Sequence, residues 1–359
     1  MSMLAVFVAL ILIFGVLWDA FETIILPRRV RRKLRITRAF YQLTWWPWSA
    51  LARRILRDNR REAMLSFYGP LALIGLLVVW AAGLLVGFAL LQWALGSHLA
   101  GQRYSGFLTD LYFSGTSFFT LGLGDLAPQT PAERLVTVFE SGLGFGFLAL
   151  IISYLPVLYQ AFSRREVSVS LLDARAGSPP TAVELLRRTH TGVREGLPQF
   201  LSDWERWAAE LLESQLSYPS IGYFRSQHEN QSWLSALTVI LDTCALVLTG
   251  AGEMPRQQAK LTFAIARHAA VDLAQVFGAD YQHAKDGRLS AADLARVREL
   301  LDAAGLPLRA DDEAEARLAH LRHMYEPYVL ALAHYFVTGL PSWLPDPEAV
   351  DDWQSSPTE

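Results

Sequence analysis

The sequence predicts an all-α membrane protein whose second half is an α-helical domain outside the membrane. Of its 359 residues, 52% are hydrophobic and 19% are charged, which is more apolar than most soluble proteins. Three apolar runs are each long enough to cross a bilayer as a helix, which takes about 20 residues. The rest of the chain has apolar residues at helical spacing and almost no strand signals.

The first expected span covers residues 3–26 and defines a first segment, 1–27. It is apolar except for Asp19 and Glu22 near its end. A signal peptide would have a basic start, a shorter apolar core and a small-residue cleavage site, so we expect an uncleaved span. A basic run follows directly, which indicates the cytoplasmic side and leaves the N-terminus outside. The run consists of Arg28, Arg29, Arg31, Arg32, Lys33, Arg35 and Arg38.

Residues 28–64 form a basic segment that we expect in the cytoplasm or along the inner membrane surface. Its tryptophans Trp45, Trp46 and Trp48 suit the headgroup layer, and its arginines suit anionic lipids. Membrane lipids are therefore expected partners of this segment.

Two further spans are expected at residues 67–95 and 132–162. Pro70 is tolerable in the first turn of the second span. Arg164 and Arg165 follow the third span and place its end inside. Neither span has arginine at every third position, so no voltage sensor of the usual kind is expected.

The stretch between these two spans, residues 106–128, is too short to cross the membrane twice. It must enter and leave on the same side, and backbone of this kind survives at membrane depth only when it is buried or lines an aqueous path. The stretch contains TLGLGD, residues 120–125. Gly122 and Gly124 alternate with L-residues and can take the positive φ values that a Cβ disfavours.

Such a backbone can turn successive carbonyls toward one axis. Around a fourfold axis the carbonyls of Thr120, Leu121, Gly122 and Leu123 would form oxygen rings that replace the hydration shell of an alkali cation. The Thr120 hydroxyl would add the innermost ring, and Gly124 completes the alternation. A pore helix expected at residues 107–119 would direct its negative C-terminal end toward the cation.

With these residues in place, the sequence resembles the potassium channel superfamily, whose signature is T-V-G-Y-G-D. Pro128, Thr130 and Arg134 follow Asp125 without gaps, as in simple two-span channels. The resemblance covers about residues 67–165, and TLGLGD is similar to the second-pore filter of two-pore-domain potassium channels.

The resemblance also implies roles for residues around the filter. Tyr112 and Phe113 fall where the family has the aromatic cuff of its pore helix, and Gly144 falls where it has the hinge glycine of its inner helix. Asp125 is expected to bond to the cuff through the Tyr112 hydroxyl or to form an external ring of negative charge. The implied pore-loop channel module is one span, the pore helix, the filter and a second span, over residues 65–165.

Two departures bear on selectivity. Leu123 has no hydroxyl to tether the filter to its cuff. Thr116 stands where some bacterial channels have a glutamate that pairs with the aspartate behind the filter.

Glu140 is an ionisable residue about two turns into the third span, and such residues usually face a bundle interior or an aqueous path. It is expected to line the cavity as a ring of carboxylates or to pair behind the filter. A protonated carboxyl bonded to a neighbouring helix is the structural alternative. The run GLGFGF lies inside an apolar span with no strand before it, so it predicts helix packing and not a nucleotide site.

The region after the third span is acidic and reads as a linker, 166–180, followed by an all-α cytosolic domain, 181–359. Helices are expected at residues 181–191, 199–216, 231–248, 256–277, 290–304 and 312–340. The segment 231–248 approaches spanning length, but Asp242 at its centre and the lack of a basic flank favour a buried helix. A buried Asp242 needs a partner that the sequence does not identify.

The cytosolic half contains few candidates for chemistry. Asp286, Gly287 and Asp293 resemble the end of a calcium loop, but Gln282 and Ala284 occupy its first two ligand positions, so a turn with Ser290 as an N-cap is preferred. His320 and His323 read as ordinary helix-face histidines, and Cys244 as a buried apolar residue. The sequence shows no nucleotide-binding regulatory domain and no nucleophile–base signature, so we expect no enzyme and no cofactor. Its acidity argues against nucleic acid.

The expected function is a homotetrameric, potassium-selective channel in the cell membrane. Each chain supplies one quarter of the oxygen rings, potassium is the permeant ion, and the cytosolic domain gates or assembles the pore, with or without a ligand or protein partner. A non-selective cation channel and a non-conducting sensor that uses the pore fold as a scaffold are the alternatives.

Overall fold

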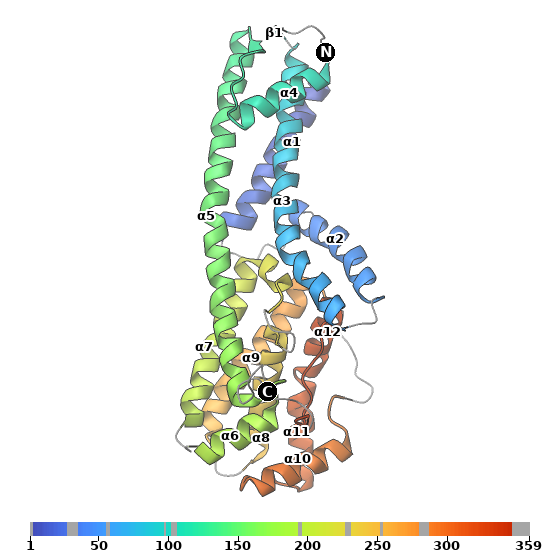
Figure 1. Ribbon diagram of the computed structural model, residues 1–359, viewed down its shortest axis with the longest axis vertical. Coiled ribbons are helices and arrows are strands. Elements are labelled where there is room, and N and C mark those ends of the chain that lie inside the picture. The colour runs from blue at the N-terminus through green and yellow to red at the C-terminus, as the bar shows by residue number, and fades with distance from the viewer. Residues whose placement is uncertain are drawn as a thin grey trace, which may run out of the picture. The chain divides into compact units, whose positions relative to one another are not determined.

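The computed structural model describes residues 3–26, 35–54, 58–96, 98–101, 106–192, 196–226, 231–251, 254–279 and 287–346. In this part of the chain the fold is helical apart from two strands of two residues each (Figure 1). The chain divides into two units. One unit comprises Met1–Pro47 with Pro70–Gln160, and the other comprises Trp48–Gly69 with Ala161–Glu359.

The first unit contains α1 and the larger parts of the two other helices expected to span the membrane. Helix α1 (Met3–Ala20) continues into a π-helical turn, Phe21–Ile25, and is followed by α3 (Asp58–Leu95) and α5 (Pro131–Ala176). By length and composition, three helical segments can cross a membrane, namely Met3–Ile25, Arg60–Leu95 and Pro131–Ala176. The three predicted spans are therefore present.

Helix α1 packs against α3 through two glycines of α3. A Cβ added at Gly83 would lie 2.8 Å from Val16, and one added at Gly87 would lie 2.6 Å from Ile13. These glycines are four residues apart, the spacing that lets membrane helices approach closely. The opposite face of α1, with Phe7 and Phe14, is exposed. The first span is thus bound to the helix that precedes the pore loop.

Helix α2 (Ile36–Ala52) occupies the middle of the basic segment 28–64. Helix α3 begins at Asp58, nine residues before the predicted start of the second span at Phe67, so Pro70 lies inside the helix and not in its first turn. The sequence from Asp58 to Gly69 contains no proline and favours a helix, which explains the earlier start.

Helix α5 corrects the predicted linker at residues 166–180. The helix does not end near Phe162 but runs without interruption to Ala176, so only Gly177 to Thr181 separate it from α6 (Ala182–Gly192). No glycine or proline lies between Pro156 and Gly177. Gly177, with a φ of +88°, and the prolines after it then stop the helix.

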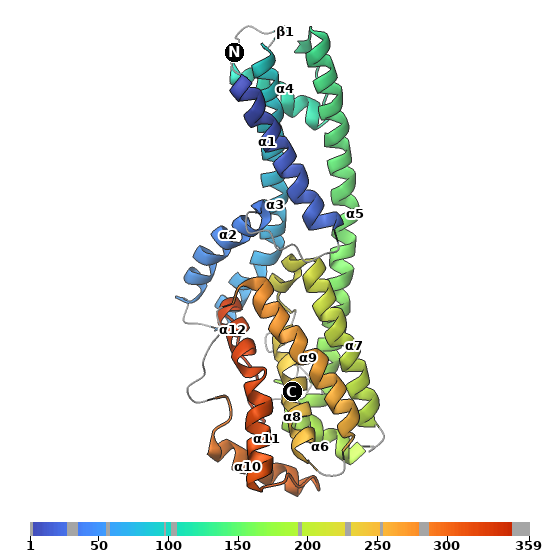
Figure 2. The ribbon, with the colours of Figure 1, turned by 180° about the vertical axis from the view of Figure 1, so that it is seen from behind.

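The second unit, whose helices Figure 2 shows from behind, is built around one apolar helix. Helix α8 (Trp233–Thr249) is buried along all 17 residues and lies against α6, α9 and α11. Helix α9 (Arg256–Phe277) also packs on α7 (Gly196–Ser217), and a 3-10 turn follows at Pro219–Tyr223. The prediction of a buried helix at residues 231–248 is confirmed.

The C-terminal helices are α10 (Ala291–Ala303), α11 (Asp312–His323) and α12 (Glu326–Phe336). The single helix predicted at residues 312–340 is wrong, because the chain breaks at Met324 and Tyr325. Pro327 explains the break, since its ring would clash with the carbonyl of His323 in a continuous helix and it has no N–H to donate.

Candidate functional site: the pore loop

The pore loop starts with a short helix and returns along a strand. Helix α4 (Phe107–Phe118) matches the predicted pore helix. After the TLGLGD stretch, β2 (Ala127–Pro128) pairs antiparallel with β1 (Leu99–Ala100), which lies before α4. The chain therefore enters and leaves the loop side by side, as a re-entrant segment must.

The backbone of TLGLGD alternates between two conformations. Gly122 and Gly124 have φ values of +57° and +76°, as the sequence predicts, and Thr120 has a φ of +54°. A Cβ at either glycine would meet no atom within 4 Å, so the conformation and not lack of space requires glycine. The positive φ of Thr120 could not be read from the sequence, because threonine rarely takes it.

The start of the loop is fixed to the pore helix. The Leu121 N–H donates to the Thr116 carbonyl at 2.8 Å, and the Thr120 N–H donates to the Ser117 carbonyl at 3.0 Å. Within the described part of the chain, no hydrogen bond reaches the carbonyls of Thr120, Leu121, Gly122 or Leu123. These four oxygens are consequently available to an ion.

The residues expected to support the filter lie beside it. The Tyr112 hydroxyl donates to Asp125 Oδ2 at 2.9 Å. This bond is one of the two roles expected for Asp125 from the sequence. Phe113 is buried. Thr116 is also buried, but its hydroxyl donates to the Phe113 carbonyl of its own helix at 2.9 Å. Asp125 is thus held by the tyrosine.

Gly144 contacts the end of the pore helix. A Cβ added there would lie 1.9 Å from the Phe118 carbonyl oxygen, so only glycine fits. Helix α5 is continuous through this position. The structure therefore assigns Gly144 a packing role, and its role as a hinge stays a prediction.

Glu140 on α5 has no exposed surface and lies against the pore helix. The Ser114 hydroxyl donates to Glu140 Oε1, and the same hydroxyl lies 3.0 Å from the Leu85 carbonyl of α3. A ring of carboxylates around a water-filled cavity does not fit a fully buried side chain. Glu140 instead joins the inner helix to the pore helix.

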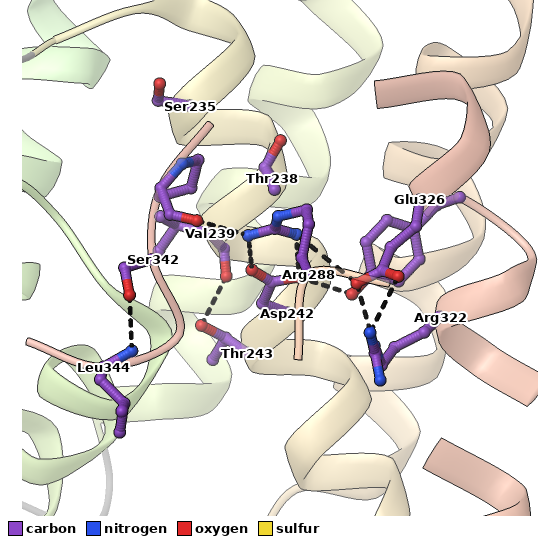
Figure 3. A network of polar contacts seen from close by, with 12 residues as sticks. Ser235, Thr238, Val239, Asp242, Thr243, Arg288, Arg322, Glu326, Ser342 and Leu344 are labelled. Atoms are coloured by element: carbon purple, nitrogen blue, oxygen red, sulfur yellow. Dashed lines mark hydrogen bonds and ion pairs between the residues drawn. The ribbon is translucent and has the colours of Figure 1, made fainter. Parts of the chain in front are cut away.

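The partner of the buried Asp242, which the sequence does not identify, is Arg288 (Figure 3). Arg288 donates two hydrogen bonds to its carboxylate, at 3.0 and 2.8 Å, and the Tyr325 hydroxyl donates a third at 2.5 Å. Burial opposes the charge of Arg288, but Asp242 outweighs it and raises the arginine pKa. The Trp343 ring lies 5.7 Å from the guanidinium groups of both Arg288 and Arg322. This network is a structural element of the second unit.

The described residues contain no group of three or more His, Cys, Asp or Glu side chains that could hold a metal ion. His320 and His323 lie in the last turn of α11. The first part of the region that resembles a calcium loop, residues 282–286 with Gln282, Ala284 and Asp286, lies outside the described residues. Ser290 caps α10 and forms a capping box with Asp293, as expected of a turn followed by a helix.

The comparison with known families agrees with this geometry. Residues 75–160 match the family described as ion channel. This segment is a two-span pore-loop ion-channel module. The matched range includes residues 75–95 of α3, the whole pore loop with Tyr112 and Asp125, and residues 131–160 of α5 with Glu140. The resemblance predicted from the filter and its flanking residues is thereby confirmed. The match is to ion channels in general and does not specify potassium.

The chain is also similar to an uncharacterized membrane protein, YdjJ, of Bacillus subtilis (strain 168). The two are 33% identical over 135 residues, which are 36% of this chain and 38% of that protein. The chain thus matches well under half of that relative. No solved structure gives a significant match.

Proposed function

We propose that the chain is one subunit of a homotetrameric, potassium-selective channel that conducts passively. The observation that carries the proposal is the alternating backbone of residues 120–124. Thr120, Gly122 and Gly124 have positive φ values, and the four carbonyls of residues 120–123 accept no hydrogen bond from the described residues. Backbone carbonyls of this kind replace the hydration shell of potassium in selectivity filters.

A fourfold assembly is proposed because one chain cannot surround an ion. In the single chain the side chains of Leu121 and Leu123 are 60% and 61% exposed, although they are apolar. Neighbouring copies around the axis would cover them, together with the apolar residues exposed on α5. The loop is therefore one quarter of a site.

The orientation follows from charge. The basic run after the first span and Arg164 and Arg165 favour the cytoplasmic side of a cell membrane, which leaves the N-terminus outside. Helix α5 belongs to both units, so a change in the cytosolic unit has a continuous helix by which to act on the pore. We assign gating or assembly to that unit on this basis.

A non-selective cation channel is the second candidate. Leu123 stands where a tyrosine hydroxyl tethers the filter in the potassium channel signature, and it forms no such bond here. Among the described residues the Tyr112–Asp125 bond is the side-chain tether of the filter, and a filter without the tyrosine tether has fewer constraints on its width.

The first test is the reversal potential of the purified protein in a planar bilayer, with potassium on one side and sodium on the other. A value near the potassium equilibrium potential is expected. A value near zero with clear current would establish the non-selective alternative.

A matched pair of variants separates conduction from a scaffold role. Gly122→Ala places a Cβ where φ is +57°, a strain of about 1–2 kcal/mol in each subunit, and should abolish flux. Gly115→Ala lies in the pore helix, also with no atom within 4 Å, and should conduct. Absence of flux from the wild type and both variants would favour the non-conducting sensor, whereas equal flux from both variants would contradict the role assigned to Gly122.

A further inference from the structure

Asp19, in the first span, joins three helices through one carboxylate oxygen. Its Oδ2 accepts hydrogen bonds from Trp80 Nε1 of α3 at 2.9 Å, and from the Thr37 N–H and hydroxyl of α2 at 3.0 and 2.6 Å. The side chain is only 2% exposed. Ionisable residues in membrane helices are costly and usually functional. Asp19 lies outside the segment that matches the channel family.

The region around Asp19 deviates from a regular helix. The chain after it forms the π-helical turn Phe21–Ile25, a feature often found at functional positions. In this turn Thr23 bonds the Asp19 carbonyl at 2.7 Å and lies 3.0 Å from the Thr37 hydroxyl. Arg35, just before α2, donates to the Thr23 hydroxyl at 2.8 Å. The first turn of α2 is therefore fixed to the end of the first span.

Helix α2 has a buried apolar side and an exposed apolar side. Tyr41 and Trp45 are buried. On the other side Leu43 and Trp46 are each 75% exposed, three residues apart and thus neighbours on the helix surface. Arg38 is exposed beside this second face. An exposed leucine and tryptophan flanked by arginine are the features of a helix that lies in a membrane interface.

We propose that α2 binds the inner leaflet of the bilayer and that Asp19 transmits the state of this lipid contact to the outer helix of the pore. The occupant is the lipid surface, with Leu43 and Trp46 in the acyl boundary and Arg38 against anionic headgroups. The proposal rests on the proposed channel function and extends it to regulation.

Two observations single out lipid as the occupant. Helix α1, to which the start of α2 is bonded through Asp19 and Thr37, exposes Phe14 and Trp18, which suit the bilayer core. The segment also carries arginines, and each Arg near an anionic surface contributes about 1 kcal/mol of attraction. Apolar area and positive charge on one short helix match an anionic leaflet.

The transmission step follows from shared contacts. The same Asp19 oxygen holds Thr37 of α2 and Trp80 of α3, so α2 cannot shift without changing the Trp80 contact. Phe40 of α2 adds a second contact, because a Cβ at Gly75 of α3 would lie 2.9 Å from its ring. Both contacts act on the helix that carries Leu85, to which the pore helix is bonded through Ser114.

The lipid contact is tested without measuring conduction. The native Cys244 is buried, so Trp46→Cys in the full-length chain accepts a bimane label selectively. In phosphatidylcholine vesicles, replacing part of the lipid with its acyl-brominated form should quench this label strongly. Leu261→Cys, at a 45% exposed leucine on α9 of the second unit, provides the control and should not be quenched. Equal, weak quenching at both positions would overturn the lipid contact.

Regulation is tested by potassium flux in phosphatidylcholine vesicles with and without phosphatidylglycerol. Wild-type flux should depend on the anionic lipid, and Arg38→Gln should shift the midpoint of a phosphatidylglycerol titration about fivefold. Leu43→Ala with Trp46→Ala should remove the dependence, whereas Phe7→Ala with Phe14→Ala, at exposed positions of α1, should keep it.

Asp19→Asn separates contact from transmission. The label at position 46 should still be quenched in this background, while the lipid dependence of flux is lost. Unchanged lipid dependence in Asp19→Asn would overturn the transmission step. Absence of flux from the wild-type protein in either vesicle would overturn the proposed function and the regulation with it, while the quenching result would still decide the lipid contact.

Discussion

Gly144 occupies the position where the resembled family has its hinge glycine, and in this structure it is also a packing contact. The resemblance predicts a hinge there, and the structure places the Phe118 carbonyl where a side chain would stand. The neighbouring glycines Gly142 and Gly146 meet nothing within 4 Å, so they do not share this constraint. One glycine of the GLGFGF run is therefore required by the pore helix.

Gly144→Ala should lower the thermal midpoint of the purified protein and reduce flux, because its Cβ forces the end of the pore helix to move. Overpacking of this kind costs about 1–3 kcal/mol. Gly142→Ala is the matched control on the same helix and should leave both quantities unchanged. If the two variants behave alike, the contact with Phe118 does not limit stability.

The sequence predicts some residue pairs of the site and misses others for a physical reason. Tyr112 and Asp125 could be paired because they lie within one short loop next to a known motif. The Ser114–Glu140 pair joins two helices, and Leu85 lies on a third, so only packing reveals them. Asp242 and Arg288, 46 residues apart, are hidden for the same reason.

At the scale of elements, helix boundaries depend on breakers more than on polarity. The segment 166–180 reads as a linker because it is rich in small and polar residues, yet the helix continues until Gly177 and the prolines beyond it. The break before α12 likewise follows from Pro327 in an otherwise periodic sequence. Existence and type of the helices were predictable from periodicity, and several ends were not.

The buried ion pair between Asp242 of α8 and Arg288 should contribute strongly to the free energy of unfolding. Arg288→Met leaves the Asp242 carboxylate buried and uncompensated, and should cost about 3–5 kcal/mol. Arg296→Met breaks an exposed pair with Glu299 and should change stability by about 1 kcal/mol or less. Thermal unfolding of the full-length protein measures both.

A double variant identifies the cause of that loss. Asp242→Leu with Arg288→Met removes both charges of the pair and should recover much of the stability, because the Asp242 carboxylate is no longer buried without its arginine. A double variant as unstable as Arg288→Met alone would show that lost packing, not the unpaired carboxylate, is responsible.

The start of α6 should be sensitive to acid through Glu184. Burial raises the pKa of this carboxyl, but hydrogen bonds from Arg187 and Arg188, at 2.6 to 2.8 Å, outweigh burial and lower it. A lowered folded-state pKa contributes stability above the ordinary glutamate value of 4.5, and this contribution is lost as the pH falls through the folded-state pKa.

Glu184→Gln should therefore lower the thermal midpoint near neutral pH and flatten its decrease below about pH 4.5. Thermal unfolding between pH 3 and 7 measures the profile. Glu184→Asp keeps the charge and should retain part of the acid dependence. A parallel profile for wild type and Glu184→Gln would exclude this carboxyl as a source of it.

At the scale of the molecule, the two units differ in what determines their fold: local sequence signals in the first and helix packing in the second. The membrane unit follows from span length, basic flanks and a filter motif, which are local signals and were predictable. The fold of the second unit depends on which helix lies at its centre. The sequence signal for this helix, α8, is that apolar residues occur on all of its sides. In the proposed channel no single chain supplies the closed ring of filter oxygens, and this gives the proposed assembly a measurable consequence.

If four copies form one pore, a single defective filter should silence the whole assembly. Co-expression of wild-type and Gly122→Ala chains in equal amounts, followed by purification and vesicle flux, should leave about one sixteenth of the wild-type flux, because only ion channels with four intact loops conduct. Two-chain assemblies would leave about one quarter, and independent chains about one half. The Gly115→Ala chain, mixed in the same ratio, should leave flux unchanged and so controls for expression. A residual of one half would contradict the tetramer directly, since each chain would then conduct alone.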